Sequence, residues 1–262
     1  MMTSQMTSHI KRVYWHLRGG WHRYRHPSYK AISPHSWMEA IERIVPRDQG
    51  RVIFVDGGAH DGQVARRFLD RYPNLEVHAF EPNSDLLPAL RTSLAQSSGK
   101  VHQAAIGATC GQMPMHINRS PMTSSLLPRS DIGKRYFDAV TQTEETRDVP
   151  VVTLDAWSEQ ERIERVDILK LDLQGYELEA LRGARQLLSR GVACVFTEIS
   201  FIPLYEGSAL FSDIDVFMRR NGYRLLNLYN LSTKQQDWQV CGGDALYVLD
   251  NHPLGINMRK AA

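Results

Sequence analysis

A glycine-rich turn directly after an apolar run is the first feature of the sequence that could perform chemistry. Residues 51–56 read RVIFVD, and the glycines Gly57, Gly58 and Gly62 follow at once. Glycines let the backbone approach a ligand closely, and the N–H groups that open the next helix can bind its polar atoms. Because Asp56 precedes the turn, it would repel a pyrophosphate and attract an ammonium or sulfonium group. The turn therefore predicts a site for a small polar ligand.

Three further acids end predicted strands. Glu81 ends the run LEVHAFEP, where its carboxylate could accept hydrogen bonds from both ribose hydroxyls of an adenosine. Asp172 ends VDILKLDL at the carboxyl edge of the sheet, where open α/β sheets bind ligands, and we interpret it as a catalytic or binding carboxylate, with a helix cap as the alternative. Glu198 ends the adjacent strand and could converge on the same site. We interpret the nearby Lys170 as a snorkelling or paired side chain.

Strands alternate with helical segments along the chain, and these elements must position the acids. This alternation predicts βαβ units and a parallel sheet with helices on both faces. The connection between the last two strands is too short for a crossover helix, so this pair should form an antiparallel hairpin. The expected strands are residues 51–56, 75–82, 101–107, 166–173, 192–200, 223–230 and 244–250, and the expected helices are residues 36–46, 63–72, 84–95, 153–162, 176–190 and 211–221.

The stretch 108–150 interrupts this alternation. It is rich in Ser, Thr, Pro and Met, and we expect a hairpin or a mobile loop there instead of a second domain. Within it we interpret Ser124 and Ser125 as part of a solvent loop, with a position over the bound ligand as the alternative. The segment 201–207, FIPLYEG, follows Glu198 and suits either an acceptor-binding lid or a plain connecting loop.

Composition excludes several classes of protein. The chain has 262 residues, of which 42% are hydrophobic and 23% charged, as expected for a globular protein and not for a disordered or fibrous one. Its three cysteines, Cys110, Cys194 and Cys241, contain no CxxC pair, which argues against a disulfide framework and a thiolate zinc site. No apolar run is long enough for a membrane helix, and the amino terminus lacks the apolar core of a secretory signal. We expect a cytoplasmic protein.

Positive charge is concentrated at the amino terminus. Residues 1–38 contain six Lys or Arg and no acid, interleaved with aromatic residues, so the rest of the chain is mildly acidic. Such an arm can lie on a membrane or another anionic surface, and the alternative is docking on its own acidic body. We divide the chain into a basic extension with a helix (1–48), a main domain (49–252) and a tail (253–262). The sequence leaves the oligomeric state open.

Taken together, the motifs resemble the FkbM family of S-adenosylmethionine-dependent methyltransferases. The resemblance covers roughly residues 51–250 and is carried by VDGGAHDG, FEPN, LKLDLQGYELEALRGA, TEISF and PLYEG. It implies an α/β, Rossmann-like class I methyltransferase fold with a mostly parallel seven-stranded sheet and a C-terminal antiparallel hairpin. It also implies transfer of a methyl group from S-adenosylmethionine to a hydroxyl of a sugar, glycan or secondary metabolite.

The resemblance assigns the cofactor-binding residues. Those at the methionine end would be Asp56, Gly57, Gly58, Ala59 and Gly62, with His60 and Asp61 at the tip of the turn. Glu81 would hold the ribose, and the adenine would lie against Pro82, Asn83, Ala105 and Ile106. Asp172 would lie near the sulfonium and the acceptor. His60 stands where related sequences often carry Asn.

Deprotonation of an alcohol requires a general base or a metal ion. Asp172 and Glu198 could act directly as the base, or they could bind Mg²⁺; we favour direct base action, because the sequence identifies no third oxygen ligand. Two other enzyme classes remain as alternatives, along with a non-catalytic module that keeps the cofactor fold. A Rossmann-type NAD or nucleotide-sugar enzyme is disfavoured by the glycine spacing. A nucleic-acid methyltransferase that uses the basic arm is disfavoured because Asp172 is followed by LQG and not by PPY, so we expect no nucleic-acid partner.

Overall fold

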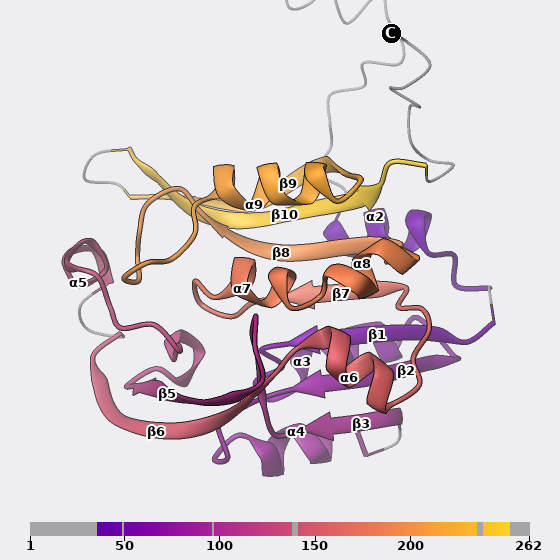
Figure 1. The fold of residues 1–262 in the computed structure, drawn as a ribbon, viewed down its shortest axis with the longest axis horizontal. Coiled ribbons are helices and arrows are strands. Elements are labelled where there is room, and N and C mark those ends of the chain that lie inside the picture. Colours follow the sequence, from indigo (N-terminus) through magenta and orange to yellow (C-terminus); the bar gives the residue numbers. More distant parts are fainter. Residues whose placement is uncertain (1–35, 49, 96, 138–140, 235–237, 252–262) are drawn as a thin grey trace, which may run out of the picture. The chain divides into compact units, whose positions relative to one another are not determined.

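The computed structural model describes residues 36–48, 50–95, 97–137, 141–234 and 238–251 (Figure 1). The chain divides into two units, Met1–Ala40 and Ile41–Ala262, and the fold given below is that of the second unit. Helix α2 (Trp37–Ile44) begins at the end of the first unit and agrees with the helix expected near 36–46. The rest of the basic arm and the tail 253–262 lie outside the described residues.

A seven-stranded sheet forms the centre of the second unit, in the order β3-β2-β1-β7-β8-β10-β9. Neighbouring strands from β3 to β8 pair in parallel, and β10 pairs antiparallel with both β8 and β9. The expected Rossmann-like fold and its final hairpin are therefore confirmed. The strands are β1 (Val52–Gly57), β2 (Leu75–Phe80), β3 (Ser98–His102), β7 (Ile168–Leu171), β8 (Cys194–Ser200), β9 (Tyr223–Thr233) and β10 (Val240–Leu249).

Helices cover both faces of this sheet because its central strands are apolar on both sides. All residues of β1 and β7 are buried, as is typical of parallel strands between helices. Val55 faces the larger core cluster, whereas Phe54 contacts Phe68 of α3 on the opposite face at a ring distance of 4.6 Å. The helices are α3 (Gln63–Leu69), α4 (Leu87–Ser93), α6 (Leu154–Gln160), α7 (Glu177–Arg182), α8 (Arg185–Gly191) and α9 (Phe211–Arg220), and α6 to α9 contribute to the larger core cluster.

The expectation of one strand over 101–107 is wrong, because this stretch serves two sheets. Strand β3 ends at His102, and β4 (Ala105–Ile106) joins a second sheet with the order β4-β6-β5. The expected hairpin within 108–150 is confirmed, because β5 (Gly111–Asn118) and β6 (Thr143–Val152) pair antiparallel. The connection between them includes the 3₁₀ helix η1 (Pro121–Thr123) and helix α5 (Asp131–Phe137). A small core of its own stabilises this sheet: Ala105, Met115, Ile117, Leu126, Val149 and Val151.

The single helix expected over 176–190 is also divided, into α7 and α8. The break falls at Gly183, whose Cα faces the carbonyl oxygen of Gly107 so closely that an added Cβ would lie 2.0 Å from it. The main-chain oxygen of Gly183 accepts a hydrogen bond from the Asp155 N–H at 2.9 Å. Two connections thus meet at a position that has room only for glycine. In the part of the chain that the structure describes, no helix is long and apolar enough to cross a bilayer.

We expect Gly183→Ala to lower the free energy of unfolding by about 1–3 kcal/mol, because the new methyl group would overlap a main-chain carbonyl that cannot rotate away. Urea denaturation measures this loss. Gly111→Ala is the matched control, since a Cβ added there would meet nothing within 4 Å. Equal stabilities of the two variants would contradict the close approach at Gly183.

Candidate active site

The glycine turn follows β1 and lies against the ends of two neighbouring strands. The N–H groups of Gly58 and Ala59 both donate to the carbonyl oxygen of Phe80, at 3.1 and 3.0 Å. Gly58 has φ +70°, and a Cβ at this position would lie 2.0 Å from the carbonyl oxygen of Asp172. Glycine is therefore required here both by the backbone conformation and by the close approach of the residue after β7.

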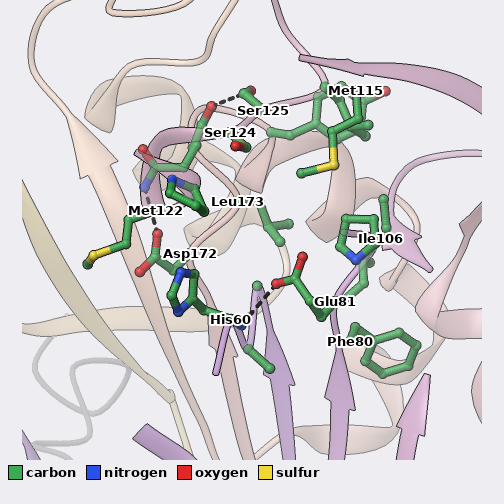
Figure 2. Close-up of a pocket in the computed structure, with 18 of the residues that line it drawn as sticks. His60, Phe80, Glu81, Ile106, Met115, Met122, Ser124, Ser125, Asp172 and Leu173 are labelled. Atoms are coloured by element: carbon green, nitrogen blue, oxygen red, sulfur yellow. Dashed lines mark hydrogen bonds between the residues drawn. The ribbon is translucent and has the colours of Figure 1, made fainter. Parts of the chain in front are cut away.

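A cavity of about 220 Å³ opens beside this turn (Figure 2). Nine of the residues expected to bind a cofactor line it: Gly58, Ala59, His60, Asp61, Glu81, Pro82, Ala105, Ile106 and Asp172. Four others, Asp56, Gly57, Gly62 and Asn83, are not among its lining residues. The turn, the end of β2 and the start of the second sheet thus meet around one space.

Glu81 is held in place by the backbone around it. One carboxylate oxygen accepts the N–H of His60 at 2.9 Å, and the other accepts the N–H of Asn83 at 2.8 Å. The side chain is 5% exposed, and burial raises its pKa although these two hydrogen bonds favour the charged form. Figure 2 shows the carboxylate at the cavity, so a buried acceptor faces the space where a ligand would lie.

The second sheet supplies the opposite wall of the cavity. Ser124 and Ser125 are buried and line it, so their interpretation as a solvent loop is wrong. Ser125 Oγ donates to the carbonyl oxygen of Gln174 at 2.7 Å, which ties this wall to the segment after β7. Sequence reasoning missed three apolar side chains of this wall, because no local periodicity in the sequence marks them: Met115, Met122 and Leu126. It also missed Tyr176, which lines the cavity from the start of α7.

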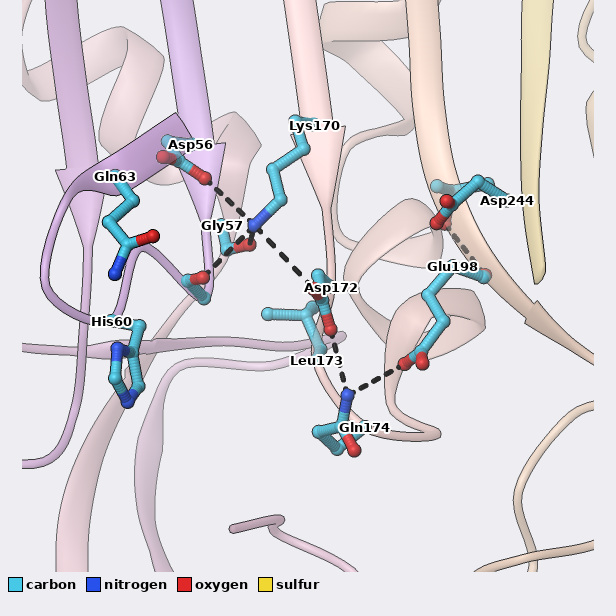
Figure 3. Close-up of polar contacts among 12 residues, drawn as sticks. Asp56, Gly57, His60, Gln63, Lys170, Asp172, Leu173, Gln174, Glu198 and Asp244 are labelled. Atoms are coloured by element: carbon cyan, nitrogen blue, oxygen red, sulfur yellow. Dashed lines mark hydrogen bonds and ion pairs between the residues drawn. The ribbon is translucent and has the colours of Figure 1, made fainter. Parts of the chain in front are cut away.

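Asp56 does not present its carboxylate to the cavity. It is fully buried, and Lys170 Nζ lies 3.0 Å from its Oδ1 (Figure 3). The same ammonium donates to the carbonyl oxygens of Gly57 and Gly58 at 3.4 and 3.0 Å. Burial raises the pKa of Asp56, and Lys170 opposes that increase. The paired role expected for Lys170 is thus observed, and the charge expected to attract a sulfonium is already matched.

A second set of acids follows β7 and lies along β8. The amide of Gln174 connects two of them, since Nε2 donates to Asp172 Oδ1 at 2.8 Å and to Glu198 Oε2 at 2.9 Å (Figure 3). Gln174 itself has φ +55°. This left-handed backbone conformation is uncommon for residues other than glycine, and the surrounding contacts must stabilise it. The two predicted catalytic carboxylates thus converge on one amide.

Burial and repulsion between carboxylates disfavour the charged forms of Glu198, Asp244 and Glu177. Burial is the main reason that the pKa of Glu198 lies well above its ordinary value, and it raises the pKa of Asp244 to about 6 and that of Glu177 to about 7. Three neighbouring carboxylates add to the increase at Glu198, namely Asp172, Glu177 and Asp244. Glu198 can therefore take up a proton closer to neutral pH than an exposed glutamate.

A second cavity, of about 330 Å³, lies on the other side of Gln174. Gln174 lines both cavities, whereas Asp172 lines only the first and Glu198 only the second. The segment 201–207 contributes Leu204 and Tyr205 to its wall. Most of the other lining side chains are polar: Thr123, Arg129, Thr141, Ser200, Asn230, Ser232 and Asp244.

The structure gives no support to a magnesium site. Among the described residues there is no group of three or more His, Cys, Asp or Glu side chains placed to hold a metal ion. Between Asp172 and Glu198 stands the Nε2 group of Gln174, which donates hydrogen bonds and is not a metal ligand. The residues present therefore do not fit the ion that the sequence left as an alternative.

Comparisons with known proteins identify the family of this chain. The profile of the Methyltransferase FkbM domain matches residues 56–225. The 2-O-methyltransferase NoeI of Sinorhizobium fredii is 25% identical over 59% of this chain and 66% of its own length. The methyltransferase sdnD of Sordaria araneosa is 28% identical over 50% of this chain and 60% of its own length. The chain thus spans less than two thirds of either relative.

A solved structure of the methyltransferase FkbM from Methylobacillus flagellatus KT is 18% identical, with a TM-score of 0.47, and the similarity covers 76% of this chain and 43% of that one. At this score the fold rests on the strand order described above and not on the likeness. The family profile covers more than half of the chain, including the glycine turn, Glu81, Asp172 and Glu198. The chain therefore belongs to the FkbM family of S-adenosylmethionine-dependent methyltransferases.

Proposed function

We propose that the protein transfers a methyl group from S-adenosylmethionine to a hydroxyl of a sugar, glycan or secondary metabolite. The observation that carries this proposal is the amide of Gln174, which lies between the two cavities and contacts a carboxylate from each. One cavity would hold the cofactor and the other the acceptor, so that the reacting atoms meet beside Asp172, Gln174 and Glu198.

The residues that line the first cavity support its assignment to the cofactor. Glu81 offers a buried carboxylate to the ribose hydroxyls, and the apolar side chains of Ile106 and Met115 offer a surface for a planar base. The turn at Gly58 and Ala59 has no side chain larger than a methyl group, which leaves room for the methionine portion. When bound, S-adenosylmethionine supplies a methyl group already activated by its sulfonium.

The second cavity fits an acceptor with hydroxyl groups. Its polar side chains can exchange hydrogen bonds with several hydroxyls, and Asp244 accepts a hydrogen bond from Asn230 Nδ2 at 2.6 Å on the same wall. A hydroxyl bound in the second cavity beside Glu198 could donate its proton to this carboxylate, whose raised pKa suits a general base near neutral pH. Alignment of the acceptor oxygen with the donor would provide much of the remaining acceleration.

The relatives support an O-methyl acceptor without identifying it. NoeI is described as a 2-O-methyltransferase, but its identity to this chain is low and the match leaves a third of its length uncovered.

A direct test uses S-adenosylmethionine with an isotope-labelled methyl group and a panel of methyl glycosides, glycolipids, polyketide alcohols, RNA and DNA. We expect label in an ether on a small-molecule or glycan hydroxyl. Label found only in RNA or DNA, or only on nitrogen, would overturn the proposal.

We expect Glu198→Gln to lower kcat by about 10²–10⁴-fold, because the amide cannot accept the hydroxyl proton. Binding of S-adenosylhomocysteine, measured by calorimetry, should remain unchanged, since Glu198 does not line the cofactor cavity. Glu206→Gln, an exposed change nearby in the chain, serves as the control and should keep full activity. Retention of activity in Glu198→Gln would remove Glu198 as the base.

The pH dependence should report the raised pKa of Glu198. The base acts in its ionised form, so kcat/KM should rise with pH through a range above the ordinary carboxyl value and then level off. Asp244 raises this pKa by repulsion, so Asp244→Asn should move the acid limb to lower pH by roughly half a unit. An acid limb that stays in place, or moves to higher pH, would contradict the proposed repulsion.

We expect Glu81→Gln to weaken binding of S-adenosylhomocysteine by about 10–100-fold, because it removes charged acceptors from the ribose position. The new NH₂ group would also face a main-chain N–H of His60 or Asn83, which both donate to Glu81 in the structure. Calorimetry measures the change, and Asp85→Asn, an exposed substitution shortly after β2, is the control. Unchanged affinity in Glu81→Gln would exclude Glu81 from the cofactor site.

A further inference from the structure

The orientation of the Gln174 amide is determined by its neighbours. An ionised carboxylate can accept hydrogen bonds but cannot donate them. The NH₂ group of Gln174 must therefore face the carboxylates of Asp172 and Glu198. The opposite end, Oε1, then needs a donor, and Tyr205 Oη lies 2.9 Å from it. Tyr205 is therefore the side chain that supplies the donor needed at Oε1 in the observed orientation.

Tyr205 is itself firmly placed. The residue is 6% exposed, and its backbone forms a β-bridge with that of Arg129. Its hydroxyl also lies 2.9 Å from the carbonyl oxygen of Thr123, which already accepts a hydrogen bond from Asn118 Nδ2 at 2.6 Å. Because the hydroxyl has a single proton and Gln174 Oε1 needs a donor, we assign this proton to Oε1. Burial raises the pKa of Tyr205, and nearby carboxylates add to the increase, so the hydroxyl keeps its proton as a donor.

We propose that Tyr205 is a positioning residue that holds the Gln174 amide with its NH₂ group toward Asp172 and Glu198. The inference rests on the proposed function only for its effect on catalysis. The hydrogen bond between Tyr205 and Gln174 does not depend on any acceptor.

The hydrogen bond from Tyr205 to Gln174 should affect the pKa of Glu198. A donated hydrogen bond stabilises an ionised carboxylate and so lowers its pKa, against the burial that raises it. If the amide rotates, this stabilisation is lost while the repulsion remains. The charged and titratable groups around Glu198 are Asp172, Glu177, Asp244, Lys170, Tyr205 and, in the wall of the same cavity, Arg129.

Tyr205→Phe tests the proposal with little change in packing. Thr123 O keeps a donor in this variant, because Asn118 Nδ2 lies 2.6 Å from it. Glutamate labelled with ¹³C at the carboxyl carbon allows Glu198 to be titrated by NMR in the full chain without acceptor, and Glu198→Gln identifies its signal. We expect the midpoint in Tyr205→Phe to move to higher pH by roughly half a unit or more.

Two further variants separate positioning from a general structural effect. Tyr247→Phe makes the same chemical change at another buried tyrosine, whose electrostatic neighbours are Asp215 and Arg219, and should leave the midpoint unchanged. Gln174→Ala should raise the midpoint by itself, and adding Tyr205→Phe to it should cause no further shift, because the two residues act through one contact.

An unchanged midpoint in Tyr205→Phe, or additive shifts in the double variant, would overturn the proposal. In turnover, Tyr205→Phe should move the acid limb of kcat/KM to higher pH with unchanged affinity for S-adenosylhomocysteine. If no hydroxyl acceptor is ever methylated, the proposed function fails while the NMR result still decides the role of Tyr205.

Discussion

The site depends on the interactions of one buried group, the ammonium of Lys170. It lies between the ends of β1 and β7, where it pairs with Asp56 and donates to the carbonyl oxygens of Gly57 and Gly58. A charge buried without a partner is strongly destabilising, so Asp56 and Lys170 must come together for either to be buried. Their pairing stabilises the backbone of the glycine turn, and the turn forms part of the wall of the first cavity.

This arrangement explains why acids gather at one edge of the sheet. The carboxyl ends of β1, β2, β7 and β8 meet there, and each has an acidic residue within two positions of its last residue: Asp56, Glu81, Asp172 and Glu198. The negative charges of two of these acids are compensated by direct partners. Asp56 pairs with the ammonium of Lys170, and Glu81 accepts hydrogen bonds from two backbone N–H groups. Glu198 accepts one hydrogen bond from a neutral amide, but its burial, and after that the repulsion by three carboxylates, raise its pKa.

Much of the fold and part of the site followed from local sequence patterns. Buried runs that end in an acid predicted the strands of β1, β2, β7 and β8, and the glycine turn and Glu81 lie where the pattern places them. The direction of the Asp56 side chain did not follow, because it depends on a lysine 114 positions later in the chain, across the β1–β7 pairing. The third strand of the second sheet was also hidden, since β4 is only two residues long, although the β5–β6 hairpin that it joins was expected.

Tyr205 shows the same limit at a smaller scale. The segment 201–207 suggested a lid or a loop, and nothing in it indicated that its tyrosine would reach Gln174 and Thr123, which are 31 and 82 positions earlier. Local patterns report which residues are buried and at which edge a strand ends. They do not report which distant donor meets which acceptor, because that depends on how separate connections pack.

The choice of an amide at position 174 has a chemical reason. A lysine or arginine between Asp172 and Glu198 would stabilise both negative charges strongly and would lower the pKa of Glu198, which would make it a weaker base. A glutamate there would add repulsion and would need a proton of its own. The amide of Gln174 donates to both carboxylates without a net charge, so it can hold them in place while burial and repulsion keep the pKa of Glu198 raised. An uncharged donor is thus the group that combines fixed geometry with a carboxylate still able to accept a proton.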